Sequence, residues 1–379
     1  MYQASSAFHN AVANNAPQKA LLVFADAIFT NEDIDVDAGI EMDDYFNTET
    51  DIAIGQALSN EIRFSLFNDD RLLNNYEFGE FTATIGARIS TGTYTDDAPV
   101  ITYDGNTVWR GRNTPPYLTR NNSAVSSQPG WPVRSIAVYG TKVYAFGGSG
   151  QYKVYTNGGT EVADTINSFM QNKSKHWAGK GLNLDMTSRI LKIYENGKTE
   201  TYEFVPFGRF IAKRPNVPDV NQIAFVCHDL MTQFDRDMES ADAIGFSYPV
   251  TIGDLFAAMC DYVGVLCQTE PFINSTAVIT EKPEEFDTAT MRQVMQWIAE
   301  AAAANLRFNR DGRLVFDWIR STSLALDEYN YIEYAPYWYE TMQVDKLYNR
   351  SSESGRDLTV GDGNIGYLIQ DNPFLKGVS

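Results

Sequence analysis

Histidine and cysteine are scarce in this chain, and their scarcity excludes several kinds of active site. The 379 residues include only three histidines, His9, His176 and His228. A histidine-based metal cluster or a Ser-His-Asp triad is therefore not expected, because each needs histidine in a specific constellation. We expect no metal site, no cofactor and no enzymatic activity from this sequence.

The three cysteines indicate where the protein is made. Their number is odd and no C-x-x-C pair is present, which is typical of reduced, mostly buried thiols in a reducing compartment. A disulfide between the second and third cysteine is the alternative, although burial is the usual fate of a free thiol. The cysteines are Cys227, Cys260 and Cys267.

The chain also lacks long apolar runs and an excess of basic residues. No run approaches the ~18 apolar residues of a transmembrane helix, and the N-terminus shows no basic, apolar secretory signal. With 30 Lys and Arg against 49 Asp and Glu, the formal net charge is −19. A chain of this sign is not expected to bind DNA or anionic membranes generically, since both require a basic surface.

The negative charge is unevenly distributed. Residues 1–70 contain two basic and 13 acidic residues, whereas residues 101–200 contain 12 basic and 6 acidic ones. The latter segment therefore carries a charge of +6, and the rest of the chain carries −25. This asymmetry predicts that the basic segment is a separate module in a different environment.

What is present is an ordinary globular composition, with 44% hydrophobic and 21% charged residues. Strict alternation over 61–67 (EIRFSLF) and 81–86 (FTATIG) predicts strands with one buried face. Segments 134–139, 142–146 and 151–155, separated by glycine turns, predict a β-meander. A hairpin is expected over 191–204 around Asn196-Gly197, and a loop over 111–131.

The character changes near residue 219. A strand over 222–227 is followed by Asp229, whose carboxylate is expected to cap a short helix over 230–238. Thr251 is expected to open a helix that Gly264 ends. Thr290 opens a third helix, and a hairpin follows around Asp311-Gly312. The apolar face of that third helix comprises Met291, Val294, Met295, Ile298 and Ala302.

In this order, the segments resemble the hub proteins at the tip of phage tails, which include the hub of contractile baseplates and the N-terminal hub of siphophage tail-associated proteins. The matching stretches are IAIGQALSNEIRFSLF (52–67), Phe207-Gly208-Arg209-Phe210 with QIAFVCHDLMTQFD after it, YPVTIGDLFAAMCDYVGV (248–265), TMRQVMQWIAEAAAANLRFNRDGRLVF (290–316) and Asn372-Pro373-Phe374-Leu375. The sequence then stops where many relatives continue into a spike-binding or lytic region, so lytic activity is not expected here.

The resemblance implies an α+β, mainly β chain with tube-like antiparallel β-barrel domains, an α+β domain and an inserted β module. The expected domains are 1–95 with about 200–218 (first tube-like domain), 96–200 (insertion), 219–323 (α+β hub domain) and 324–379 (second tube-like domain, completed by strands from elsewhere in the chain). Residues 96–200 depart from the family pattern.

The resemblance also implies a function. Three copies would form a hub in the virion at the tail tip, assembled in the host cytoplasm. The hub would contact a distal tail or tail tube protein, the tape measure protein and a spike or fibre. Genomic DNA would pass through the lumen without specific binding, and an acidic lumen would repel its phosphates. The alternative physical interpretation is that the negative charge only keeps the protein soluble.

The insertion suggests a second function, that of a carbohydrate-binding adhesin that contacts a host surface glycan. Exposed aromatic rings beside amides and hydroxyls suit stacking on sugars or on a partner protein, whereas buried rings would only fill the module's own core. The candidate recognition residues are Trp109, Tyr117, Trp131 and Trp177. An envelope-degrading enzyme is a third interpretation, which the lack of a nucleophile motif disfavours.

Four further motifs have simpler structural explanations. Gly147–Gly150 is expected to be a hairpin loop and not a phosphate cradle, because the G-x-x-x-x-G-K-[ST] pattern is missing and a strand follows instead of a helix. Gly361–Asn364 is expected to be a turn without calcium. The acidic stretches 35–37 and 41–44 are expected to be solvated loops. At His228-Asp229, capping by Asp229 accounts for the motif without a catalytic base.

Overall fold

The computed structural model divides the chain into two compact units. Unit 1 contains residues 1–42 and 61–227, and unit 2 contains residues 43–60 and 228–379. Each unit is described by itself. The structure describes residues 4–24, 27–35, 39–43, 55–68, 71–75, 77–148, 150–163, 179–185, 187–212, 216–219 and 221–317, together with strands 346–350, 357–360 and 366–370.

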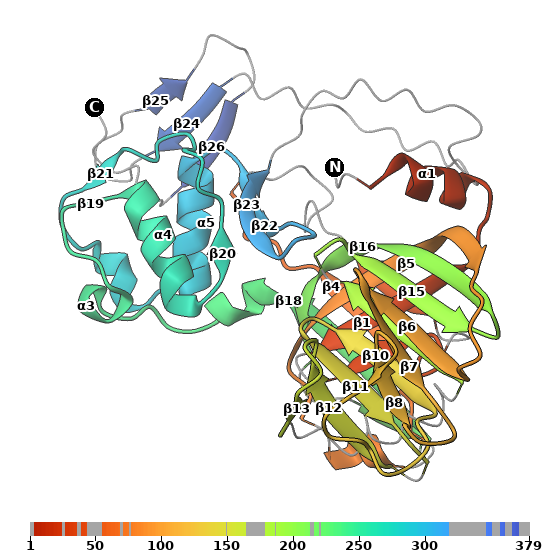
Figure 1. The fold of residues 1–379 in the computed structure, drawn as a ribbon. Coiled ribbons are helices and arrows are strands. Elements are labelled where there is room, and N and C mark those ends of the chain that lie inside the picture. Colours follow the sequence, from red (N-terminus) through yellow and green to blue (C-terminus); the bar gives the residue numbers. More distant parts are fainter. Residues whose placement is uncertain are drawn as a thin grey trace. The chain divides into compact units, whose positions relative to one another are not determined.

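Unit 1 consists almost entirely of strands (Figure 1). Its helical elements are α1 (Ser6–Ala13) and the short 3-10 helix η1 (Leu72–Asn75). Its strands are β1 (Gln18–Phe24), β2 (Ile28–Thr30), β3 (Ile40–Asp43), β4 (Glu61–Phe67), β5 (Glu80–Thr93), β6 (Val100–Asp104), β7 (Thr107–Gly111), β8 (Leu118–Arg120), β9 (Ser123–Ala124), β10 (Ser135–Tyr139), β11 (Lys142–Phe146), β12 (Tyr152–Thr156), β13 (Glu161–Val162), β14 (Lys180–Asp185), β15 (Ile190–Glu195), β16 (Lys198–Ile211), β17 (Asn216–Asp219) and β18 (Gln222–Asp229).

Most of these strands form one 14-stranded sheet in which β5 and β16 are the longest members. These two strands pair antiparallel from Thr93 opposite Lys198 to Glu80 opposite Ile211, with two register shifts. The predicted meander is confirmed as β10, β11 and β12, and the predicted hairpin as β15 and β16. Strand β14 joins the meander by pairing parallel to β10, which the sequence did not indicate.

A second sheet of four strands, in the order β6-β7-β8-β9, lies close to the large sheet. The closest approach is at Gly181 in β14, where a Cβ atom would lie 1.7 Å from the carbonyl oxygen of Ile101 in β6. Because that neighbour is backbone, only glycine fits at this position. Strands β8 and β9 also lie within 111–131, so that expected loop contains short strands.

The core of unit 1 is divided into separate apolar clusters. The largest joins strands from both ends of the unit and includes Phe64, Phe81 and Phe225. Another is built only from residues between 100 and 155 and includes Trp109 and Tyr155. The segment predicted as an insertion therefore has an apolar cluster of its own, although its strands β10–β15 share the large sheet with β16 and β18.

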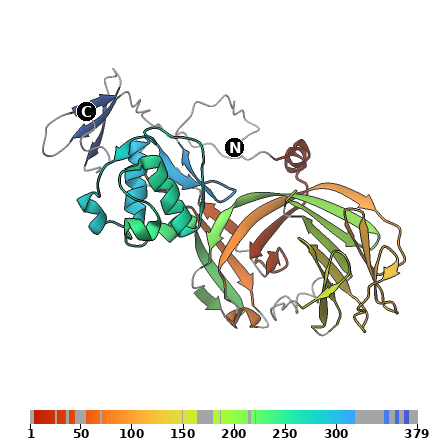
Figure 2. The same cartoon turned by 60° about the vertical axis from the view of Figure 1, so that its left-hand side comes forward.

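Unit 2 combines short helices with small sheets, and Figure 2 shows its helices α4 and α5 side by side. Its helices are η2 (Leu230–Phe234), α3 (Ala241–Ile244), α4 (Ile252–Val263), η3 (Glu284–Asp287) and α5 (Met291–Ala301). Its strands are β19 (Val250–Thr251), β20 (Leu266–Cys267), β21 (Val278–Ile279), β22 (Asn305–Phe308), β23 (Arg313–Asp317), β24 (Lys346–Arg350), β25 (Asp357–Val360) and β26 (Gly366–Gln370).

The predicted helix starts in unit 2 are confirmed. Thr290 and Gln293 form a reciprocal capping box at α5, with each side chain bonded to the other residue's backbone N–H. At α4 the Thr251 hydroxyl accepts from the Asp254 N–H, but the shorter Asp254 carboxylate accepts from that hydroxyl instead of the backbone. All five apolar residues predicted on one face of the third helix are buried.

A segment from early in the chain completes unit 2. Residues 55–60 run beside β22: Ala57 and Leu306 form a parallel bridge, and the Leu58 N–H donates to the Leu306 carbonyl at 2.8 Å. The Gln56 N–H donates to the Asn305 side chain at 3.0 Å. The sequence places this stretch in the first β domain, whereas its contacts group it with residues 228 onwards.

The chain is mainly β with few helices and mixed sheets, which confirms the broad fold class. The tube-like barrels are not confirmed: among the pairings described, the large sheet ends at β13, β3, β2 and β17, and the paired strands do not form a closed barrel. The C-terminal segment contributes the three-stranded sheet β25-β24-β26, and the domain boundaries inferred from the resemblance stay predictions. Within the described residues, none of the helices has the length and apolar character needed to cross a membrane.

Candidate functional site

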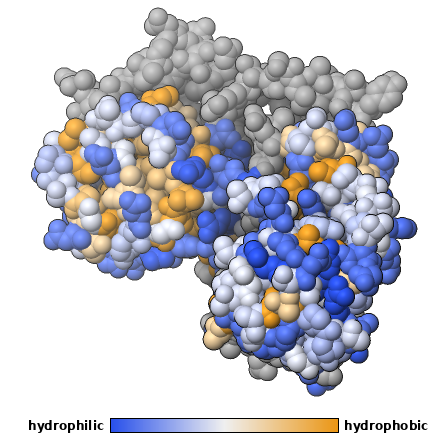
Figure 3. Space-filling model, in the orientation of Figure 1, coloured by the Kyte–Doolittle hydropathy of each residue, from blue (hydrophilic) through white to orange (hydrophobic). Residues whose placement is uncertain are grey.

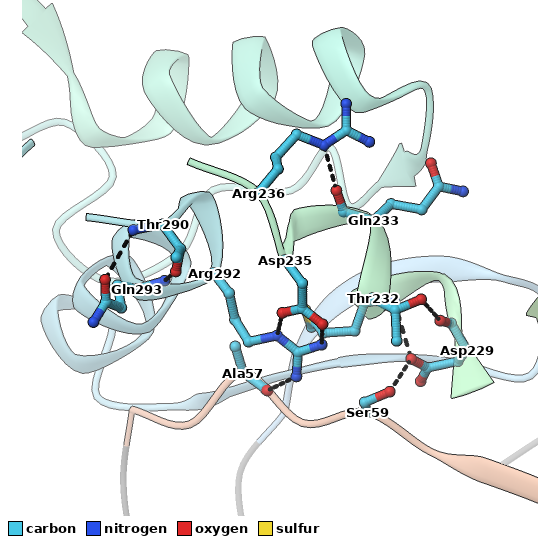
Figure 4. A network of polar contacts seen from close by, with 11 residues as sticks. Ala57, Ser59, Asp229, Thr232, Gln233, Asp235, Arg236, Thr290, Arg292 and Gln293 are labelled. Atoms are coloured by element: carbon cyan, nitrogen blue, oxygen red, sulfur yellow. Dashed lines mark hydrogen bonds and ion pairs between the residues drawn. The ribbon is translucent and has the colours of Figure 1, made fainter. Parts of the chain in front are cut away.

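The carboxylate of Asp229, at the end of β18, is a buried polar group that several hydrogen bonds hold (Figure 4). Asp229 is only 2% exposed. Its Oδ1 accepts from the Ser59 hydroxyl at 2.9 Å and from the Met231 N–H at 3.0 Å, and its Oδ2 accepts from the Asn60 N–H at 2.9 Å. The predicted cap is thus confirmed, with η2 as a 3-10 helix shorter than expected. The same carboxylate also fixes residues 59 and 60.

An ion pair next to this carboxylate fixes the same segment to α5. Arg292 in the first turn of α5 pairs with Asp235, with 2.9 Å between Nη2 and Oδ2. The Arg292 Nη1 lies 3.5 Å from the carbonyl oxygen of Ala57 (Figure 4). We call Asp229, Ser59, Asn60, Arg292 and Asp235 the polar clasp, since together they join segment 57–60, η2 and α5.

Burial sets the protonation behaviour of the clasp. Desolvation raises the pKa of Asp229 to about 6, against the opposing effect of the hydrogen bonds from Asn60, Met231 and Ser59 and of the Arg292 charge. At neutral pH the group is therefore a buried carboxylate that accepts three hydrogen bonds. Such an arrangement fixes backbone segments, because each of its acceptor contacts is made within the fold.

The adjacent histidine does not cooperate with Asp229. Along β18 exposure alternates, so that His228 is exposed and Asp229 is buried. The two side chains leave the strand on opposite faces. A histidine oriented by this aspartate, as general-base catalysis would require, is not formed here.

Two of the three cysteines interact in unit 2. Cys260 in α4 is buried, Cys267 in β20 is partly exposed, and both are free thiols. A hydrogen bond with Cys260, aided by the positive charge of Arg313, lowers the pKa of Cys267 to about 7. The same hydrogen bond, together with burial, raises the pKa of Cys260. Cys227 is a buried thiol, as expected.

Of the candidate aromatic residues in 96–200, one is a core residue and two are half-buried. Trp109 is fully buried, and its indole Nε1 lies 3.4 Å from the Asn157 side chain. The prediction that Trp109 is a surface residue is therefore wrong, because it lies on the inward face of β7. Tyr117 and Trp131 are half-buried against the same cluster, and Trp177 lies outside the described residues. The visible face of unit 1 is largely hydrophilic (Figure 3).

The remaining motifs form ordinary local structure where they are described. Gly147–Gly150 connects β11 to β12, and the Gly147 N–H donates to the Gln151 carbonyl at 2.9 Å, as expected of a hairpin loop. Asp35 accepts from the Gln222 side chain at 2.8 Å. Residues 36–37, 44 and 361–364 lie outside the described residues. Among the residues that the structure describes, no three His, Cys, Asp or Glu side chains group as metal ligands.

Comparison with known proteins gives a distant likeness among solved structures. No protein-family model matches the chain, and no curated protein matches it either. Among solved structures it is similar to a 43 kDa tail protein of prophage MuSo2 from Shewanella oneidensis, with 10% identity and a TM-score of 0.34. The match covers 93% of this chain and 72% of that one. A similarity this low establishes neither a family nor a shared function.

Proposed function

We propose that this protein is a structural component of a bacteriophage tail tip, where three copies form a hub around the channel for DNA. In this proposal each hub contacts the tail tube or distal tail protein and the tape measure protein on one side, and a spike or fibre on the other. The proposal rests on the sequence segments shared with tail hubs, and not on the distant structural match.

The observation that supports the proposal most is the order of elements in unit 2. Three of the matched stretches form β18 with η2, β19 with α4, and α5 with β22 and β23, and all of these residues except 222–227 of β18 lie in unit 2. Part of a fourth stretch, residues 55–60, pairs with β22 in the same unit. Segments that resemble a family separately, and that also assemble with one another, favour a common architecture over chance similarity.

The charge of the chain agrees with a passage for DNA. Residues outside 101–200 carry a charge of −25, with 13 of the acidic residues in the first 70 positions. A wall of this sign repels phosphates, so that DNA passes without the salt-dependent binding that Lys and Arg would create.

Association into a trimer would cover apolar side chains that are exposed on the single chain. Four large apolar residues between 262 and 278 are exposed, namely Tyr262, Leu266, Ile273 and Val278. Hydrophobic side chains are visible at several places on unit 2 in Figure 3. Exposed apolar groups of this kind are common at protein interfaces.

Chemical cross-linking of purified tails tests the stoichiometry. The proposal predicts that cross-linked tails yield a product that contains three copies of this chain. The products are separated by mass under denaturing conditions. The free protein at the same concentration is the comparison, because a hub can require the tail in order to assemble. Exclusively monomeric or six-copy species from tails would contradict the trimer.

The alternative function, a carbohydrate-binding adhesin, is no longer supported by Trp109, which is buried. Sugar binding by residues 96–200 is instead favoured by a cavity, which is described below, and not by an exposed aromatic surface.

A further inference from the structure

Unit 1 contains a cavity of about 600 Å³ that none of the features above explains. Three strand connections contribute to its lining: Asp104-Gly105 between β6 and β7, Gly140-Thr141 between β10 and β11, and Asp185, Thr187, Ser188 and Ile190 where β14 leads into β15. Strands β10 and β14 pair in parallel and both contact β6, where the Tyr103 carbonyl accepts from the Asn183 side chain of β14, so that the three connections line one cavity. Its volume lies in the ~300–1,000 Å³ range typical of small-molecule sites.

Two of these turns keep the cavity open. Gly105 and Gly140 have φ angles of +56° and +58°, the left-handed conformation that two-residue hairpin turns require. At both positions a Cβ atom would meet no atom within 4 Å. The rim is therefore free of side chains at two places, and a ligand of several atoms can enter between the turns.

The polar groups that line the cavity include both donors and acceptors with unused capacity. Within the described part of the chain, neither the Lys192 ammonium nor the Thr141 hydroxyl has a side-chain partner. Asn183 uses its amide N–H₂ to donate to the Tyr103 carbonyl, which leaves its Oδ1 as an acceptor. Asp104 accepts through Oδ2 from Asn157, which leaves Oδ1.

The charges disfavour an anionic ligand. Asp104, Asp185 and Lys192 line the cavity, which gives it one more negative than positive group. Asp185 remains ionised, because the Ser188 hydroxyl and the N–H groups of Ser188 and Thr187 lower its pKa despite partial desolvation. These hydrogen bonds also hold the Asp185 carboxylate within its own turn. A phosphate or carboxylate ligand would therefore be repelled, whereas neutral hydroxyl groups would not.

The cavity also has an apolar part. Val138, Leu184 and Ile190 lie on its lining next to the Tyr103 side chain. The Tyr103 ring packs against the Tyr194 ring, with 5.2 Å between centroids, and this contact restrains it. The combination of an apolar wall with separated donors and acceptors matches a ring that has a C–H face and several hydroxyl groups.

We propose that this cavity binds a neutral pyranose sugar residue, with Lys192 and Thr141 donating to its hydroxyl oxygens and with Asn183 and Asp104 accepting from its hydroxyl groups. The proposal concerns unit 1 of a single chain. It is independent of whether three copies assemble on a tail.

Saturation-transfer NMR on the full chain tests the proposal. The probes are the methyl glycosides of glucose, galactose and N-acetylglucosamine, and tetrahydropyran serves as a ring of the same size without hydroxyls. We expect transfer to the ring protons of at least one glycoside and none to tetrahydropyran. Absence of transfer to all three glycosides, or equal transfer to tetrahydropyran, would overturn the proposal.

Two variants locate the binding. Thr141→Val removes the hydroxyl from an exposed turn, and Lys192→Gln removes the ammonium from an exposed strand position, so neither should affect folding. Each should weaken glycoside binding roughly fivefold, as expected for loss of one hydrogen bond. Lys198→Gln, in β16 and not part of the cavity lining, is the matched control and should bind as the parent does. Unchanged binding in both cavity variants would overturn the assignment, even if the sugar binds elsewhere.

Discussion

The two units differ in the sequence separation of the contacts that define them. In unit 2 the helices η2, α3, α4 and α5 each begin at a residue whose side chain accepts from a backbone N–H two or three residues ahead, as Thr290 does at α5. In unit 1 the longest pairing joins β5 to β16, more than 100 residues apart in the chain. This difference indicates that the helices of unit 2 are specified largely by local interactions, whereas unit 1 requires distant strands to pair closely. Substitutions at the long-range strand contacts of unit 1 should therefore disrupt unit 1 and leave the helices of unit 2 intact.

The largest effect is expected at the closest approach in unit 1. Gly181→Ala would place a Cβ atom against the Ile101 carbonyl, and backbone cannot move aside as a side chain can. We expect a loss of roughly 3 kcal/mol or more from the free energy of unfolding of unit 1. Urea denaturation measures this loss of unfolding free energy, and hydrogen exchange of the backbone amides in each unit shows that unit 1 is the one affected.

Gly92→Ala is the matched control for this change. Gly92 also lies in a long strand, β5, but its nearest neighbour is the Thr199 Cβ at 4.0 Å, an ordinary contact. This variant should change stability by less than about 1 kcal/mol. If both glycine variants have equal effects, the close contact between β14 and β6 is not what holds the two sheets together.

The next largest effect is expected at the polar clasp. Asp229→Ala removes a helix cap and leaves the Ser59 hydroxyl and the buried Asn60 N–H without their acceptor. The expected cost is about 2–3 kcal/mol of unfolding free energy, confined to unit 2. Ser59→Ala, which removes only one donor, should cost about 1 kcal/mol. If Asp229→Ala instead lowers the hydrogen-exchange protection of amides in unit 1, the contrast drawn between the two units is wrong.

The same residue gives the clasp a pH dependence. The pKa of Asp229 is about 6 in the folded protein, against an ordinary value of 3.8. The folded state thus binds more protons than the unfolded state between these values. This group's stabilisation is fully present below about pH 4 and is lost as the pH rises through about 6. Asp229→Asn should remove this fall of the unfolding free energy between pH 4 and pH 6. If the variant and the parent lose unfolding free energy equally over this range, another group is responsible for the pH dependence.

A smaller effect is expected at the cap of α5. Thr290→Ala removes the acceptor for the Gln293 N–H and should lower the unfolding free energy by about 1 kcal/mol. Thr290→Ser retains the hydroxyl and should be close to the parent. Exchange rates of the first-turn amides of α5 measure the change, and equal rates in the two variants would show that the capping box contributes nothing.

The smallest effect concerns reactivity and not stability. Because the pKa of Cys267 is about 7, its alkylation rate by iodoacetamide should rise with a midpoint near that pH. Cys260, which is buried, and Cys227 should react only on unfolding. Mass spectrometry of peptides identifies the labelled thiol. A midpoint near the ordinary thiol value, or first labelling at Cys260, would contradict the assignment.

The sequence predicted those features that depend on neighbouring residues. Helix caps, the Asp311-Gly312 hairpin and the apolar face of α5 follow from spacing alone. The parallel pairing of β10 with β14 and the position of residues 55–60 beside β22 could not be predicted, because they depend on contacts between distant segments.

The candidate site could not be predicted from the sequence either, because the direction of a side chain on a strand also depends on distant contacts. Trp109 alternates inward on β7, and nothing in its neighbours distinguishes a core ring from a surface ring. The cavity between the three turns was missed because its lining residues are separated by up to about 90 positions. Gly105 and Gly140 indicate two-residue turns in the sequence. They do not indicate that these turns lie side by side and line one cavity.

The central claim is that three copies of this chain surround the channel at the tail tip. Electron microscopy of intact tails, with a Fab fragment bound to this protein and reconstruction without imposed symmetry, tests it most directly. The account predicts Fab density at the distal end with three-fold symmetry around an axial channel. Fab density along the shaft or on the capsid, or a labelled tip with any other symmetry, would contradict it.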